Sequence, residues 1–202
     1  MTETLTVREA AERRRSIRGF TTEPVPRAAM DEILRVAGLA PSAFNAQPWR
    51  FVVVESPEAK ARLAAAARNQ RQVLAAPAVI VLYTDMADTL ATIDEVLHPG
   101  MEPARRATAG SGFVAGFVAK TDAEREAWGA EQGYIALGYL LLAAESHGYQ
   151  TSPMLGFDPA AVRELLGLPA HVRVPAIVAI GRGDETGFVH HRHPTGRIVR
   201  YV

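Results

Sequence analysis

The segment EQGYIALGYLLLAAESHGY, residues 131–149, decides the fold. It is apolar on nearly every face of a helix, and Gly148 supplies a stop at its end. Upstream, Thr121 and Glu124 have the spacing of a capping box, which marks a helix start. A helix that is apolar around most of its circumference is buried in protein. The pattern therefore predicts a helix from Glu124 to His147 that is central to the fold or packs against another subunit.

Short runs of Val, Ile, Leu and Ala on both sides of this helix predict strands that are buried on both faces. They are Arg50–Glu55, Ala78–Tyr83 and Pro175–Ile180. Further helices are expected after the capping box Thr6/Glu9, after the N-cap pairs Ser56-Pro57 and Asp158-Pro159, and between Pro26 and Gly38, where Met30, Ile33, Leu34 and Ala37 recur with helical spacing. This order of elements is typical of an α/β or α+β sandwich with helices covering a sheet.

Size and charge restrict the class of protein. A chain of 202 residues suffices for one core, and we expect a single domain over residues 1–202. The 22 Lys and Arg balance 22 Asp and Glu, so nucleic acid and anionic membranes are not expected partners. The longest apolar stretch, Ile135–Ala144, is too short to span a bilayer, and Met1–Leu5 does not begin a secretory signal. We expect a soluble, cytoplasmic protein.

Redox and binding chemistry are constrained by the absence of Cys and the excess of Arg. Without Cys there is no disulfide, thiolate metal site or cysteine nucleophile, so redox chemistry needs an organic cofactor or a metal with other ligands. The segment RRRSIRGF, residues 13–20, places four guanidiniums and a hydroxyl within six residues, a set that could clamp a phosphate. The alternative is a solvated basic helix end, which the helix dipole also favours.

A second candidate segment is APSAFNAQPW, residues 40–49, directly before a predicted strand. Its prolines and small residues make a rigid turn, from which Ser42, Asn45 and Gln47 could present hydrogen-bonding groups to a planar heteroaromatic, with Trp49 as an apolar wall. The alternative is an ordinary polar loop with a core Trp.

Two segments fit the pattern of a sandwich less well. In residues 85–120, the prolines and glycines interrupt helical patterning, with Gly110, Gly112 and Gly116 close together. We expect a variable helical excursion that could cover a site. Residues 186–202 form a C-terminal arm whose last residues have strand propensity and are expected to add to a sheet edge, of this chain or of a partner.

Several motifs in register resemble one known family. RRSIRGF and APSAFNAQPWRFVVV are similar to the opening of the nitroreductase family, the FMN-dependent NAD(P)H oxidoreductases. The resemblance continues through NQRQVLAAPAVIVL at 69–82, EQGYIALGYLLLAAESHGY at 131–149 and SPMLGFDPAAVRELLGLP at 152–169, and leaves residues 85–120 without a clear match. It implies an α+β three-layer sandwich, with a central mixed sheet covered by helices, that forms an intertwined homodimer with FMN at the subunit interface and C-terminal arms around the partner.

The resemblance also implies which residues bind FMN. They are Arg14, Arg15, Ser16, Arg18, Pro41, Ser42, Asn45, Gln47, Asn69, Gln72, Pro153, Met154, Leu155, Gly156 and Arg192. Arg14 and Ser16 match positions that hold the phosphate and ribityl chain, with Arg15 beside them, and Arg192 matches a C-terminal phosphate clamp. Arg18 matches a cation at the flavin N1/O2 edge, where it would favour the anionic reduced flavin.

The remaining matches surround the flavin ring. The loop with Ser42, Asn45 and Gln47 matches the family's pyrimidine contact, contributed partly by the other subunit, and Asn69 matches a further flavin-edge contact. The segment from Pro153 to Gly156 matches a turn whose backbone N–H approaches flavin N5, so no catalytic side chain is expected.

Some residues depart from the family's pattern. Gln72 replaces a Lys of some members, Leu155 replaces an acidic residue, and His190 replaces a second basic phosphate contact. We interpret the run from His190 to His193 as no metal site, because Arg192 would repel a cation. The glycines at 110–116 lack the preceding strand and following acidic residue of a dinucleotide-binding loop.

The resemblance implies that NADH or NADPH, as a transient reductant, gives a hydride to flavin N5, and that an electron-poor small molecule such as a nitroaromatic or quinone then takes the electrons. Alternatives are a specialised flavin dehydrogenase or dehalogenase, and a non-enzymatic FMN-binding protein.

Overall fold

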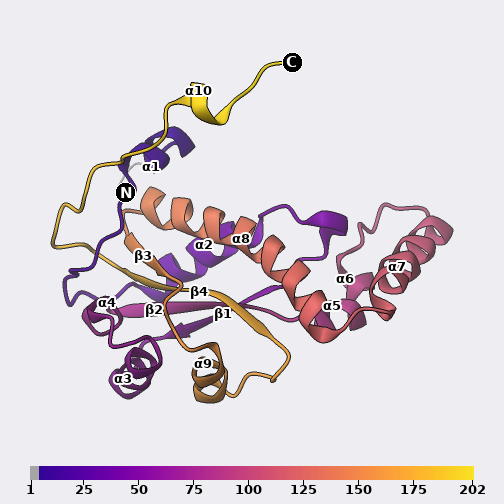
Figure 1. The fold of residues 1–202 in the computed structure, drawn as a ribbon, viewed down its shortest axis with the longest axis horizontal. Coiled ribbons are helices and arrows are strands. Elements are labelled where there is room, and N and C mark those ends of the chain that lie inside the picture. Colours follow the sequence, from indigo (N-terminus) through magenta and orange to yellow (C-terminus); the bar gives the residue numbers. More distant parts are fainter. Residues whose placement is uncertain (1–4) are drawn as a thin grey trace.

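A sheet of four strands lies between two layers of helices in the computed structural model, which describes residues 5–202 (Figure 1). The strands are β1 Trp49–Val54, β2 Ala78–Thr84, β3 Gln150–Met154 and β4 Arg173–Gly181, in the order β1-β2-β4-β3. The three strands expected from the sequence are confirmed. β3 was not predicted, because its residues QTSPM lack the apolar, β-branched run of the other three.

The expectation of a mixed sheet is wrong for these four strands. β1 with β2, β2 with β4 and β4 with β3 all pair antiparallel. Within residues 5–202, the parallel contribution is an isolated bridge between Ser16 and Thr151. Strands buried on both faces usually indicate a parallel sheet, but here two helix layers bury an antiparallel one. The three-layer α+β sandwich itself is as expected.

One face of the sheet is covered by α2 Arg27–Gly38 and by the long α8 Asp122–Ser146. α8 is the predicted central helix. Its capping box between Thr121 and Glu124 is formed, and Gly148 has φ 77°, a left-handed conformation that glycine adopts without strain. Buried α8 residues such as Ala136 and Leu140 pack against even-numbered residues of β2, Ile80 among them. This packing fixes α8 over the centre of the sheet.

The opposite face is covered by α3 Pro57–Ala66, α4 Arg71–Ala75 and α9 Pro159–Leu166. The predicted N-caps are confirmed, because Ser56 accepts a hydrogen bond from the backbone of Ala59 and Asp158 accepts from Ala160. Leu63 and Val162 join Val79 and Val81 in a second core. Since successive strand residues point to opposite faces, one short strand such as β2 belongs to both cores.

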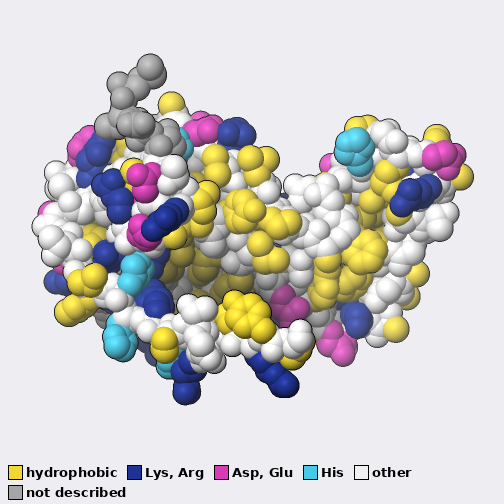
Figure 2. Space-filling view, turned by 90° about the horizontal axis from the view of Figure 1, so that it is seen from above, with side chains coloured by type: hydrophobic (Ala, Val, Ile, Leu, Met, Phe, Trp, Pro, Cys, Tyr) yellow, Lys and Arg dark blue, Asp and Glu magenta, His cyan; other side chains and the backbone are white. Residues whose placement is uncertain are grey.

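Residues 85–120 form α5 Met86–Ala91, α6 Ile93–Val96 and α7 Pro103–Val118, and their Phe113 and Phe117 form a small third core together with Ala46 and Trp128 from outside the excursion. The excursion projects from one end of the sandwich, and Figure 2 shows a hollow between it and the body. The three glycines do not interrupt the helix as expected, since α7 runs through them. At Gly110 the glycine allows close packing, because a Cβ there would lie 2.5 Å from Asp94 Oδ1.

The first described helix, α1, and the C-terminal arm lie on the α8 side of the molecule (Figure 1). α1 Val7–Arg13 begins at the predicted capping box of Thr6 and Glu9. The arm from residue 186 carries a short helix, α10 Thr195–Ile198, and its last residues, 199–202, are exposed. They do not join this chain's own sheet, so that part of the expectation is wrong, while pairing with a partner stays a prediction.

Two findings bear on the expected location of the protein. Residues 1–4, which belong to the segment used to judge a secretory signal, lie outside the described residues. None of the helices in residues 5–202 combines the length and apolar character needed to cross a membrane.

Candidate functional site

A cationic pocket joins the two ends of the chain. Arg14, Arg15, Ser16 and Arg18 line it together with Arg192 of the C-terminal arm. Its volume is about 270 Å³, and the other lining residues are Phe188, Val189, His190 and His191. The arm is tied to α1 by a 3.0 Å contact between His190 Nε2 and the carbonyl oxygen of Ala11. The structure thus brings together residues that the sequence placed near opposite ends of the chain.

Arg14 is a partly buried cation of this pocket. Its Nη1 is buried and has no hydrogen-bond partner among the described residues. Burial, and then the positive charge of Arg192, lower the pKa of the Arg14 guanidinium. A buried cation with an unused donor is costly unless an anion pairs with it. The pocket therefore favours an anionic group, and guanidinium forks with a Ser hydroxyl are suited to the oxygens of a phosphate.

The segment from Pro153 to Gly156 contains the end of β3 and the residues that follow it. Pro153 and Met154 are the last residues of β3, so the expected turn begins only after Met154. Leu155 is exposed to 66%, and its side chain points away from the core. Gln70 Nε2 donates a 2.9 Å hydrogen bond to the carbonyl oxygen of Gly156, which holds the turn against the segment before α4.

A chain of amides continues from this turn. Gln72 Nε2 donates to Gln70 Oε1 at 3.2 Å, and Gln72 is only 6% exposed. Asn69, next in sequence to Gln70, has a left-handed backbone with φ 53°. The neutral amides of Gln72 and Gln70 thus connect the buried position 72 to the turn at Gly156. Position 72 is the one at which some family members are expected to carry a lysine.

The loop with Pro41, Ser42, Asn45 and Gln47 lies elsewhere in the chain. Its own hydrogen bonds shape it, since Ser42 Oγ accepts from the Gln47 backbone N–H at 3.0 Å. Asn45 Nδ2 donates to the carbonyl oxygen of Val96 at 2.6 Å, which ties the loop to α6 of the excursion. None of these four loop residues lines the cationic pocket. One chain therefore holds the predicted site residues in separate groups.

Comparisons with known proteins identify the family. A model of the nitroreductase family matches residues 11–182, most of the chain. The chain belongs to the nitroreductase family. It is 48% identical over 195 residues to an NADH dehydrogenase of Thermus thermophilus, covering 96% of this chain and 95% of the relative. An iodotyrosine deiodinase of Thermotoga neapolitana is 28% identical over 195 residues and is covered to 96%, as is this chain.

This nitroreductase-family chain also resembles a solved structure over its whole length. A protein of Exiguobacterium sibiricum, described as a nitroreductase in complex with FMN, superposes with a TM-score of 0.89 at 29% identity and covers all of both chains. Residues 85–120, which lack a clear motif match, therefore have a counterpart in that fold. The likeness rests on chain path as well as on short motifs.

In this family member the residues suit the phosphate end of FMN. The test is the orphaned Nη1 of Arg14, because a buried unpartnered guanidinium donor beside Ser16 and Arg192 calls for an anion with several acceptor oxygens. The pocket of about 270 Å³ is of a size for the phosphate and part of a sugar-like chain rather than a whole dinucleotide.

Two residues of the pocket also have structural partners. Arg15 Nη1 donates to the carbonyl oxygens of Glu12, Arg13 and Arg14 at 2.7–3.0 Å, so it caps the end of α1. The backbone N–H of Arg18 donates to Glu185 Oε1 at 2.7 Å, a bond that lowers the pKa of that carboxyl. The solvated basic helix end proposed as an alternative thus describes part of this segment, while Arg14 is half-buried.

Sequence reasoning missed Gln70 and the buried Glu145. Gln70 had no signal, because one Gln in RNQRQ is unremarkable. Glu145 did have one: it stands alone in the apolar end of a predicted helix, where the helix dipole disfavours an anion.

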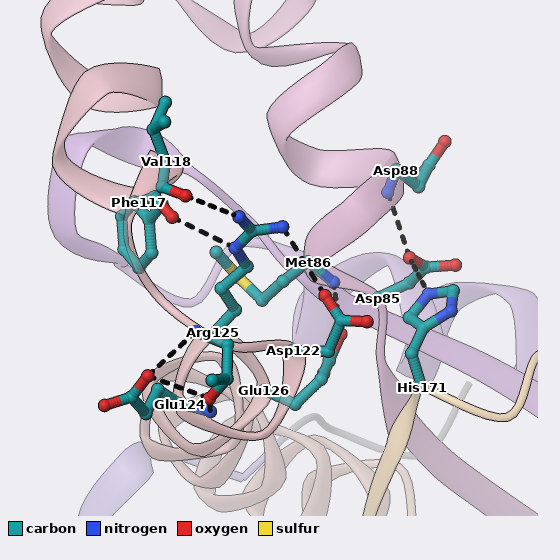
Figure 3. A network of polar contacts seen from close by, with 11 residues as sticks. Asp85, Met86, Asp88, Phe117, Val118, Asp122, Glu124, Arg125, Glu126 and His171 are labelled. Carbon is teal, nitrogen blue, oxygen red and sulfur yellow. Dashed lines mark hydrogen bonds and ion pairs between the residues drawn. The ribbon is translucent and has the colours of Figure 1, made fainter.

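Asp85, Glu126 and His171 form a separate polar cluster, with ligand-type atoms within 4.8 Å of one another (Figure 3). His171 Nε2 lies 3.0 Å from Asp85 Oδ1. The buried Glu126 accepts from Thr84 Oγ1 at 2.8 Å and from the Met86 backbone N–H at 2.6 Å. These bonds already engage the three groups and brace the start of the excursion against α8.

Proposed function

We propose that this nitroreductase-family protein is an FMN-dependent oxidoreductase that is reduced by NADH or NADPH and delivers electrons to an electron-poor small molecule, such as a nitroaromatic or quinone. The observation that carries the proposal is the cationic pocket with the unpartnered buried donor of Arg14. The FMN-complexed relative and the NADH dehydrogenase relative support it. When bound, FMN supplies the hydride-accepting chemistry that a chain without Cys has no side chain to supply.

The chain's own residues would act by binding and orientation. Arg14, Ser16 and Arg192 would hold the phosphate, and the positive charge of Arg18 would lie at the pyrimidine edge. The bond from Gln70 to the carbonyl of Gly156 would fix the turn whose backbone N–H faces the flavin. Preorganised groups of this kind contribute to rate by positioning, without proton transfer of their own.

We further propose that the working form is a homodimer. The loop with Ser42, Asn45 and Gln47 does not line the phosphate pocket of its own chain, and a second copy would supply this loop to a site that combines both groups. α8 also leaves large apolar side chains exposed, Tyr134, Ile135 and Tyr139 among them, where Figure 2 shows hydrophobic side chains gathered on the upper face.

The first test is flavin binding. The purified protein should be yellow, or should become so with added FMN, and NADH or NADPH should bleach it until an acceptor restores the colour. Arg14→Ala should weaken FMN binding by about 2 kcal/mol, or roughly thirtyfold, because it removes charged hydrogen bonds to the phosphate. The matched control is Arg8→Ala, since Arg8 is exposed on the same helix and does not line the pocket.

If the purified protein shows no flavin absorption, even after FMN is added, the proposal is wrong. Equal losses of FMN affinity in the two Arg variants would remove the specific role of Arg14. A bound flavin that neither nucleotide bleaches would favour the non-enzymatic alternative.

A specialised dehalogenase is the second candidate, and the iodotyrosine deiodinase relative favours it. Such an enzyme should prefer one halogenated substrate. A screen of nitro, quinone and halogenated aromatic acceptors decides between the two, because a specialised enzyme shows one kcat/KM far above the others.

A further inference from the structure

The loop of residues 40–48 holds three side-chain-bearing residues in a disfavoured backbone conformation. Phe44, Asn45 and Gln47 have φ values of 58°, 56° and 45°, in the left-handed region. Asn tolerates this region, but Phe and Gln remain there only where surrounding contacts impose it. The shape of the loop therefore depends on the groups that hold it.

The excursion supplies several of these groups. In addition to the bond from Asn45 to α6, Phe113 of α7 lies against Phe44, with ring centroids 5.3 Å apart. Asp85, the N-cap of α5, donates its backbone N–H to the carbonyl oxygen of Pro48 at 3.0 Å. Each helix of the excursion, through its own residues or its N-cap, thus contributes a contact to the loop.

Arg50 joins the loop to α5 through one guanidinium. Its Nη1 donates to the carbonyl oxygens of Gln47 at 2.9 Å and Trp49 at 2.8 Å, and its Nη2 forms an ion pair with Asp88 Oδ2. Nη1 has two N–H groups, one for each carbonyl, which leaves Nη2 for the carboxylate. The sheet register brings the pair together, because Arg50 lies opposite Tyr83 near the end of β2 and Asp88 lies in the first turn of the next helix.

The bond from Arg50 fixes one side of a residue that is also held on the other. The Gln47 backbone N–H donates to Ser42 Oγ, and its carbonyl oxygen accepts from Arg50. Because the allowed side-chain rotamers depend on the backbone conformation, these two bonds also restrict where the Gln47 amide points. The side chains of Arg50 and Asp88 are 35% and 47% exposed, and ion pairs this exposed add little to fold stability. The arrangement therefore acts mainly on the shape of the loop.

We propose that Arg50 is a positioning residue for cofactor binding: its guanidinium, held by Asp88, fixes the backbone at Gln47 and so keeps the loop in the form that contacts the flavin ring. The inference rests on the proposed function, because it takes this loop as a contact of the flavin. Arg50 does not line the cationic pocket, so it acts through the loop and not through the phosphate. Through Asp88, the excursion takes part in holding the cofactor.

Two flavins separate this role from that of the phosphate pocket. Riboflavin has the ring and sugar chain of FMN without the phosphate, so a residue that acts on the ring should affect both flavins by the same factor. Arg14→Ala should instead weaken FMN alone. The dissociation constants are measured by flavin fluorescence on apoprotein. Hydrogen exchange of the apoprotein adds a readout without flavin, because it reports how often the loop opens.

Arg50→Ala should raise the Kd for FMN and for riboflavin about tenfold, the size of one lost hydrogen bond, and should speed exchange at amides 43–47. Arg50→Lys should weaken both flavins nearly as much, because a compact ammonium does not reproduce the planar fork that serves two carbonyls and Asp88 together. In Gln47→Ala, the added Arg50→Ala should change either Kd by less than about twofold, since residues that act through one another are not additive. Arg62→Ala, at an exposed position of α3, is the control and should leave both constants and the loop exchange unchanged.

Unmodified affinity in Arg50→Lys would overturn the inference, because it would reduce the role of Arg50 to its charge. A loss confined to FMN, or unchanged exchange of the loop in Arg50→Ala, would also overturn it. Should Arg50→Ala not fold, Asp88→Asn removes the ion pair at constant shape and should weaken both flavins about threefold, and unchanged constants there would count against the proposal. If the unmodified protein binds neither flavin, the proposed function fails instead.

Discussion

At the residue scale, buried polar groups in this protein serve either a binding site or a structural junction, and their hydrogen bonds tell the two apart. Arg14 and Glu145 keep buried atoms without partners, while Glu126 is fully engaged. Through its bonds with Thr84 and Met86, Glu126 joins the end of β2 to α8, and Figure 3 shows Met86 and Glu126 close together. The unpartnered donor of Arg14, which lines the cationic pocket, points to a ligand, while the satisfied carboxylate of Glu126 points to a structural role.

Glu126→Ala should destabilise the fold by about 2–4 kcal/mol, because it removes two hydrogen bonds and leaves the Met86 backbone N–H unpartnered. Urea unfolding of the variant measures the loss. Glu131→Ala is the control, since Glu131 is exposed on the same helix. A loss as small as that of the control would contradict the bracing role.

The contribution of Glu126 to the free energy of unfolding should depend on pH, and the direction of its raised pKa gives the sign. Burial raises the pKa of Glu126 above its unfolded value. The stability linked to this proton is complete below the unfolded pKa and is lost as pH rises through the raised folded value. Glu126→Gln, which does not titrate, should lack that part of the decline in a series of urea melts.

At the element scale, the helices and strands with strong local signals could be predicted, and those defined by tertiary contacts could not. The caps at Thr6, Ser56, Thr121 and Asp158 are local hydrogen bonds, and the structure confirms them. β3 escaped prediction because its pairing with β4, rather than its composition, makes it a strand. α7 was obscured by its three glycines, of which Gly110 packs closely against Asp94 of α6, while Gly112 and Gly116 have open space around them.

The residues of the candidate site also fall into those that could be predicted from the sequence and those that could not. The segment around Arg14 and the arm with Arg192 could be named from their resemblance to the family, and the structure places both at one pocket. Their roles in binding stay predictions. Gln70 could not be found from sequence, because it matters only through its bond to Gly156, which the fold supplies, whereas Glu145 had a signal as an acid in the apolar end of a predicted helix.

The excursion should behave as a cooperative unit of its own. Phe113 lies at its centre, with ring centroids 5.3, 5.1 and 5.8 Å from Phe44, Phe117 and Trp128. Phe113→Ala should cost about 3–5 kcal/mol in this small core, enough to unfold it locally. Hydrogen exchange should rise in residues 86–118 and stay slow in β2 and β4.

The control for this experiment is Val118→Ala, because Val118 is 69% exposed at the end of α7. Its exchange pattern should match that of the unmodified protein. A uniform rise in exchange over the whole chain in Phe113→Ala would show instead that the excursion and the sandwich unfold together.

At the scale of the whole molecule, an apolar face runs along α8. Tyr139 lies on it, 39% exposed, and lines a cavity of about 300 Å³ with Val7, Val36 and Leu142. Such a face is typical of a surface buried between subunits. Net charge is zero, so long-range repulsion does not oppose association of two copies.

Tyr139→Glu should shift the protein from dimer to monomer, because it places an unpaired charge in an apolar contact. Sedimentation velocity measures the change, and FMN should be lost with the dimer. Leu74→Glu makes the same kind of substitution on α4, in the opposite layer, at a residue that is 56% exposed. It should remain dimeric, and a monomeric Leu74→Glu or a dimeric Tyr139→Glu would place the interface elsewhere.

The separate core of the excursion has a consequence for how this protein can diversify. Its Phe113 and Phe117 pack mainly with one another and with Trp128, while the sheet has its own two cores. Because Ala46 and Trp128 of the sandwich also belong to this core, changes in residues 86–118 that keep these contacts should leave the two cores of the sheet in place. Sequence changes in the excursion can therefore accumulate without a rebuilt sheet, which makes residues 86–118 the natural segment to alter by engineering.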